Sequence, residues 1–89
     1  MTSIEILEEA IKVQKAKALD YQANGVERSD YFPFGVESYL QMIHIKVMRL
    51  RATATNDDTQ FESAMDSAID LINYSSFLAE YLMEKNNDD

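Results

Sequence analysis

The residues that break helices are confined to one short stretch of this chain. Its two glycines, Gly25 and Gly35, and its single proline, Pro33, all lie between residues 24 and 35. Glycine adopts left-handed backbone angles freely and proline lacks an amide hydrogen, so both residues end helices. Everything outside this stretch can therefore be helical. We expect an all-α fold with a single domain, residues 1–85, followed by a disordered acidic tail, residues 86–89.

Apolar side chains recur at helical spacing in three segments, residues 3–22, 36–54 and 60–85. Thr2 and Glu5 fit a capping box before the first segment, and a turn at residues 56–59 precedes the third. The expected core stripes are Ile4, Leu7, Ile11, Gln14, Ala18 and Tyr21 in the first segment, and Val36, Leu40, Ile43, Val47 and Leu50 in the second. The third segment is apolar on two sides, which predicts a three-helix antiparallel unit that completes a multi-helix bundle by association into a homo-oligomer.

Charge and composition exclude several classes of partner. The chain has 8 Lys and Arg against 16 Asp and Glu, a net charge of −8, so phosphate backbones and anionic membranes repel it. We therefore expect neither DNA or RNA nor a membrane as partner, and the absence of an apolar run of roughly 20 residues agrees with this. A small anionic ligand stays open, because a pocket needs only two or three cations. With no cysteine, disulfides and thiolate metal sites are excluded.

A row of polar side chains marks the third segment. Glu62, Asp66, Asp70 and Asn73 follow each other at spacings of four, four and three residues, so they lie on one helix face. Carboxylates in such a row are oxygen donors suited to Mg²⁺. The same spacing also fits an ordinary solvated acidic face.

Two further groups carry chemistry. Lys46 and Arg49, three residues apart, can hold a phosphate, or they can pair with the acidic row across an antiparallel hairpin. Lys17, Asp20 and Tyr21 end the first helical segment just before an aromatic loop that contains Phe34. These rings can stack on a nucleobase or can belong to the core. His44, the only histidine, has no metal or triad partner in the sequence, and we interpret it as structural or superficial.

Taken together, these residues resemble a known family, the small helical phage and bacterial proteins called nucleotide modification associated domain 1, relatives of the MazG-type all-α nucleoside triphosphate pyrophosphatases. The motifs that carry the resemblance are Lys17-x-x-Asp20-Tyr21, Tyr31-Phe32-x-Phe34-Gly35 with Ser38, Lys46-x-x-Arg49-Leu50 and Glu62-Ser63-x-x-Asp66-x-x-x-Asp70-Leu71-Ile72-Asn73-Tyr74. They span most of the chain, and the last is the most specific.

The resemblance implies a MazG-like bundle of several chains that binds a phosphorylated nucleotide. The first residues have neither a basic start nor an apolar signal core, so we expect a cytoplasmic protein, in the host cytoplasm if a phage encodes it. Carried over, the metal ligands for Mg²⁺ are Glu62, Asp66 and Asp70. The ligand-binding residues are Lys17, Asp20, Tyr21, Phe34, Lys46, Arg49, Asp70, Asn73 and Tyr74.

The chain departs from the MazG pattern on its second helical segment. MazG-type enzymes carry a Glu-x-x-Glu pair there, whereas this segment offers Glu37 and then Gln41 and His44. The facing half of a metal site is missing, which leaves the catalytic residues unassigned and favours a protein that binds and sequesters a linear or cyclic nucleotide, as an anti-defence protein does. The alternatives are a Mg²⁺-dependent pyrophosphohydrolase and a helical protein-interaction subunit.

Overall fold

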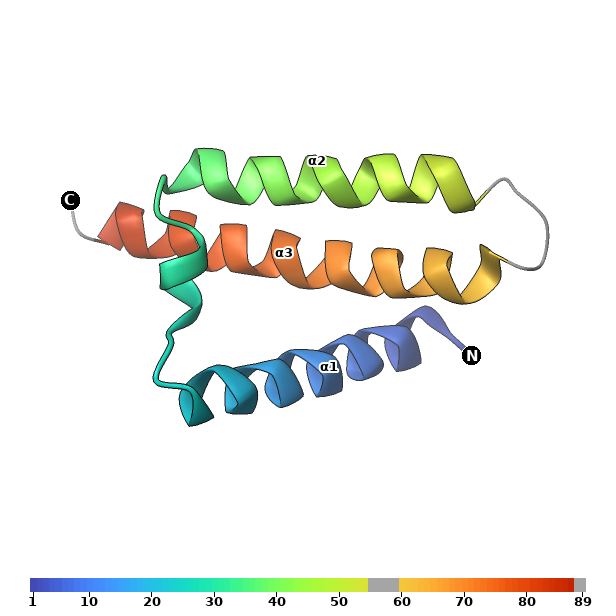
Figure 1. Cartoon of the computed structure of the whole chain (residues 1–89), viewed down its shortest axis with the longest axis horizontal. Coiled ribbons are helices and arrows are strands. Elements are labelled where there is room, and N and C mark those ends of the chain that lie inside the picture. The colour runs from blue at the N-terminus through green and yellow to red at the C-terminus, as the bar shows by residue number, and fades with distance from the viewer. Residues whose placement is uncertain (55–59, 88–89) are drawn as a thin grey trace.

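Three helices and a short linker account for the residues that the structure describes, 1–54 and 60–87 of a computed structural model. The helices are α1 (Ser3–Ala23), α2 (Val36–Thr53) and α3 (Phe61–Asn87), and a 3₁₀ turn, η1 (Arg28–Tyr31), lies between the first two. The predicted all-α, three-helix fold is confirmed. Successive helices run in opposite directions, so α1 and α3 point the same way, and α3 lies between the other two (Figure 1).

The helix ends follow the local signals in the sequence. The predicted capping box is present, since the Thr2 hydroxyl accepts from the Glu5 amide and the Glu5 carboxylate accepts from the Thr2 amide. These hydrogen bonds hold the pKa of Glu5 below its usual value. Gly25, with φ +69°, follows the C-cap Asn24 and ends α1. The predicted turn at residues 56–59 lies outside the described residues.

The second loop glycine stands where a side chain does not fit. Gly35 is the N-cap of α2 and has φ +61°, and a Cβ built there would lie 2.7 Å from the Tyr81 hydroxyl. Glycine therefore lets the start of α2 approach α3 closely.

The C-terminal end of α3 extends beyond the predicted helix. The helix continues through Asn87, two residues into the segment expected to be a tail, and Asp88 and Asp89 lie outside the described residues.

The aromatic residues of the loop differ in how far they are buried. Phe32 is buried and stacks on Tyr39 with the ring centroids 4.3 Å apart, and Tyr31 lies beside Tyr21 at 5.1 Å. Phe32 thus belongs to the core, whereas Tyr31 contacts the end of α1 and is 58% exposed. Phe34 does not, because it is 79% exposed, and only its backbone amide is tied down, by a hydrogen bond to the Ser38 hydroxyl.

The interior differs from the predicted core. Among the described residues, the buried apolar side chains are Ala10, Phe32 and Tyr39, whereas the buried polar ones are Ser38, Lys46, Ser67 and Asn73. The predicted stripe of α1 is wrong for Ile4, Leu7, Ile11 and Ala18, which are exposed, and that of α2 is wrong for Leu40 and Val47. The reason is that α1 packs on α3 through the small Ala10, and α2 turns Tyr39 and Lys46 toward α3 instead of its apolar stripe.

Candidate functional site

Asp70 is the centre of the polar interior. It lies on α3 between the two other helices and accepts from Lys46 of α2 at 3.0 Å through one oxygen and from Lys17 of α1 at 3.2 Å through the other. The Lys46 side chain is 11% exposed, Asp70 18% and Lys17 50%. One carboxylate thus links three helices and carries two cations, which leaves an excess of positive charge around it.

Asn73, one turn further along α3, is held by hydrogen bonds to α1. Its amide nitrogen donates to the Ala10 carbonyl at 3.0 Å, and its oxygen accepts from the Gln14 amide at 3.3 Å. The Gln14 amide also lies 3.3 Å from the Ser76 hydroxyl. Because a buried amide needs its partners, this network fixes α1 against α3 at one register.

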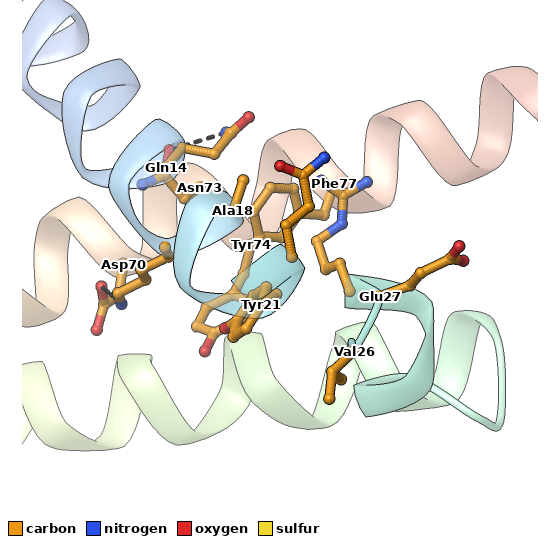
Figure 2. A pocket seen from close by; sticks show the side chains of 12 residues that line it. Gln14, Ala18, Tyr21, Val26, Glu27, Asp70, Asn73, Tyr74 and Phe77 are labelled. Carbon is orange, nitrogen blue, oxygen red and sulfur yellow. Dashed lines mark hydrogen bonds and ion pairs between the residues drawn. The ribbon is translucent and has the colours of Figure 1, made fainter. Parts of the chain in front are cut away.

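A cavity of about 310 Å³ opens beside this network, between the end of α1, the start of the linker and α3 (Figure 2). Its wall has four chemical parts: aromatic rings, the cations Lys17 and Arg28, the carboxylates of Glu27 and Asp70, and side-chain amides. The lining residues are Gln14, Lys17, Ala18, Tyr21, Gln22, Val26, Glu27, Arg28, Asp70, Asn73, Tyr74 and Phe77. This volume suits a small planar ligand with polar edges.

The aromatic and cationic walls of this cavity are already organised. The Arg28 guanidinium lies 4.0 Å from the centre of the Phe77 ring and donates to Glu80 at 3.0 Å. Partial burial is the main cause that raises the pKa of Tyr74, with the neighbouring Lys17 opposing it. The Tyr74 phenol therefore stays protonated at neutral pH and keeps its capacity to donate a hydrogen bond.

A second cavity, of about 330 Å³, lies on the far side of Asp70 between α2 and α3. Lys46 and Arg49 line it together with the hydroxyls of Thr53, Ser63 and Ser67 and the carboxylates of Asp66 and Asp70. Asp70 is common to both cavities. Two cations and several hydroxyls at one place are donors that suit a phosphate group.

The two cavities gather five of the nine predicted ligand-binding residues in the first and three in the second, Asp70 being shared. Asp20 and Phe34 line neither cavity. Lys46 pairs with the acidic row through Asp70, whereas no carboxylate of the described residues lies within ion-pair distance of Arg49. Sequence reasoning missed Arg28 and Phe77, although Phe77 continues the spacing of Asp70 and Asn73 by one more turn.

The predicted Mg²⁺ ligands are not brought together. Glu62 and Asp66 are exposed, Asp70 is turned to the two lysines, and residues 1–54 and 60–87 contain no group of three His, Cys, Asp or Glu side chains that could hold a metal. The physical reason is that eight residues of helix separate Glu62 from Asp70 by about 12 Å, and the facing helix supplies cations instead of further carboxylates. The donor set therefore does not fit a resident Mg²⁺.

Comparison with known proteins adds no identity to this geometry. No protein-family model, curated protein or solved structure matches the chain. In the part of the chain that the structure describes, none of the helices has the length and apolar character that crossing a membrane requires.

Proposed function

We propose that this protein binds a phosphorylated nucleotide and holds it intact, as a sequestering, anti-defence type of protein would. The observation that carries the proposal is the concentration of cations beside aromatic rings in an acidic chain. Four of the chain's eight Lys and Arg residues line the two cavities, against three of its 16 Asp and Glu residues, Glu27, Asp66 and Asp70. The motif resemblance to nucleotide-binding helical proteins points in the same direction.

The chemistry of each cavity suggests how the ligand lies. The rings of Tyr21 and Tyr74 offer stacking surfaces to a base, and the amides of Gln14 and Asn73 lie at the wall where its polar edge would come. The phosphate then lies toward Lys46 and Arg49 in the second cavity. Arg49, free of a carboxylate partner among the described residues, can donate two parallel hydrogen bonds to it.

Binding is favoured over hydrolysis by the residues present. Phosphoryl chemistry with a metal needs several carboxylates around the substrate, whereas Asp70 is already shared by Lys17 and Lys46. The ligand is therefore expected to leave unchanged.

Thermal unfolding with a panel of linear and cyclic nucleotides, with and without Mg²⁺, tests this function. A nucleotide at 100 times its Kd stabilises the native state by about 2.7 kcal/mol, which raises the Tm by roughly 10–20 °C for a domain of this size. Arg49→Ala and Tyr21→Ala should abolish the shift, whereas Lys12→Ala, a 77% exposed cation on α1, should keep it. The recovered ligand should be intact. Product formation would establish the hydrolase, and the absence of any shift would leave the interaction subunit.

We also propose that the protein is a homo-oligomer. The chain exposes 6746 Å², whereas a monomeric protein of 10.2 kDa exposes about 5,300 Å². Its radius of gyration is 14.5 Å, against about 12 Å for a compact chain of 89 residues. The excess of about 1,400 Å² is more than the roughly 800 Å² that one partner buries in a standard interface. A chain with so few buried apolar side chains gains its missing core by association.

A further inference from the structure

The apolar stripe that α2 does not use inside the chain has the spacing of a coiled-coil seam. Val36, Leu40, Ile43, Val47 and Leu50 follow each other at intervals of four, three, four and three residues, and we call this row the α2 seam. A repeat of seven residues with two apolar positions keeps one face of a helix against a partner helix. The row is therefore patterned for helix pairing.

The structure leaves the α2 seam partly uncovered. Leu40 is 44% exposed and Val47 38%, whereas Val36, Ile43 and Leu50 are half-buried. The buried side of α2 is instead defined by Tyr39 and Lys46, which point toward α3. On a helical wheel the mean direction of the α2 seam lies about 70° from these two residues, so it flanks the contact with α3 and is open to a further helix.

We infer that the α2 seam of one chain pairs with the α2 seam of a second copy of this chain, with the two helices antiparallel. This inference rests on the proposed self-association and is independent of nucleotide binding. The surface excess favours a second copy as the partner, since about 1,400 Å² per chain exceeds the roughly 800 Å² that each partner buries in a standard interface.

Charge along the flank of the α2 seam selects the direction of pairing. Glu37 lies at the start of α2 and Arg51 near its end, and they occupy equivalent heptad positions beside the α2 seam. In an antiparallel pair, Glu37 of each copy meets Arg51 of the other, and Leu40 packs against Leu50. In a parallel pair, the two cationic ends, each with Arg49 and Arg51, lie side by side and repel. His44, close to the middle of α2, then lies near the two-fold axis.

The first test is the mass in solution by light scattering after size-exclusion chromatography. The wild-type chain should give a mass at least twice 10.2 kDa. The double variant Leu40→Lys/Val47→Lys should lose this assembly. The control Leu19→Lys/Met83→Lys changes two residues of 66% and 63% exposure outside the α2 seam, with the same change in charge, and should keep it. A monomeric wild type would overturn self-association itself. If the wild type assembles but the seam variant assembles equally well, the α2 seam is not the interface. The same conclusion follows if the control variant loses the assembly as fully as the seam variant does.

The second test does not depend on how well the lysine variant folds. Since the chain has no cysteine, His44→Cys introduces a single thiol near the proposed axis, and a short bismaleimide should convert the protein to a covalent dimer. Lys12→Cys on α1 should stay monomeric under the same treatment. No dimer from His44→Cys would refute the pairing.

The third test addresses direction. Glu37→Arg and Arg51→Glu each place like charges opposite one another and should raise the dissociation constant several-fold, and the double swap should restore it. Additive losses in the double swap would refute the antiparallel arrangement. All these variants keep Arg49, and nucleotide binding is measured separately by the thermal shift. Failure of one proposal therefore does not decide the other.

Discussion

Replacing Asp70 by asparagine removes the one carboxylate of the described residues that lies within ion-pair distance of Lys46. The change keeps the size of the side chain and a hydrogen-bonding oxygen, but it deletes the negative charge. Lys46 then stays in the interior, with its side chain 11% exposed, and its ammonium group has no counter-charge. Charge is therefore the main property that this substitution changes.

The magnitude follows from the exposure of the two lysines. Breaking a buried ion pair by removing one partner costs 3–5 kcal/mol in free energy of unfolding. Because Asp70 is still 18% exposed, we expect the lower end of this range, about 3 kcal/mol. The pair with Lys17 adds little, because a half-exposed lysine contributes at most about 1 kcal/mol. With a urea dependence of about 1 kcal/mol per M for a small domain, the midpoint of Asp70→Asn should fall by about 3 M.

Urea unfolding followed by circular dichroism, at one fixed protein concentration, measures this. The control Lys17→Met should lower the free energy of unfolding by less than about 1 kcal/mol. In a double-mutant cycle, Lys46→Met/Asp70→Leu should recover most of the loss, because an apolar pair of similar volume replaces a buried ion pair at little cost. The reasoning is refuted if Asp70→Asn costs no more than Lys17→Met, or if the two substitutions of the cycle are additive.

Three further outcomes are expected. Asn73→Leu should cost about 1–3 kcal/mol in urea unfolding, because it removes the amide that joins α1 to α3, and Ser76→Ala should cost less. Gly35→Ala should lower the Tm, since its Cβ would meet the Tyr81 hydroxyl at 2.7 Å, and Tyr81→Phe should restore part of the loss; equal losses with and without the hydroxyl would leave only backbone strain. The raised pKa of Tyr74 means that its contribution to stability is present below pH 10, the value of a free phenol, and is lost as the pH rises through the folded pKa. Tyr74→Phe should therefore flatten the alkaline fall of the Tm, and an unchanged profile would contradict this.

The helices could be predicted because their signals are local. The capping box at Thr2 and Glu5 and the glycine at position 25 act through neighbouring backbone groups, and the structure places helix ends within two residues of the predicted ones. Which face of each helix is buried depends instead on its partner. The α2 seam has a better apolar pattern than the face with Tyr39 and Lys46, so hydrophobic periodicity alone selected the wrong side.

The candidate site residues of α3 could be placed together from the sequence, because their spacing along one helix is a local property. Asp70, Asn73 and Tyr74 share one side of α3, so any partner helix meets them together. The meeting of Lys46 with Asp70 was one of two alternatives, because spacing on a single helix does not show which residues face it. Phe34 was assigned to the ligand through the loop motif, but its backbone is fixed by Ser38 while its ring points into solvent.

The buried pair of Lys46 and Asp70 allows the proposed ligand binding to be tested separately from folding stability. An ion pair in the interior is typically no more stabilising than apolar residues of similar volume, and a chain with three buried apolar side chains among its described residues would gain from a larger core. The proposed ligand site would give these charges a role: Lys46 would be dehydrated and positioned before a phosphate binds, and Asp70 would balance its charge in the free protein. Lys46→Met/Asp70→Leu should accordingly come close to the wild type in its urea stability while showing no thermal shift with any nucleotide. A variant that still binds its nucleotide would place the phosphate elsewhere and make this pair a structural feature only.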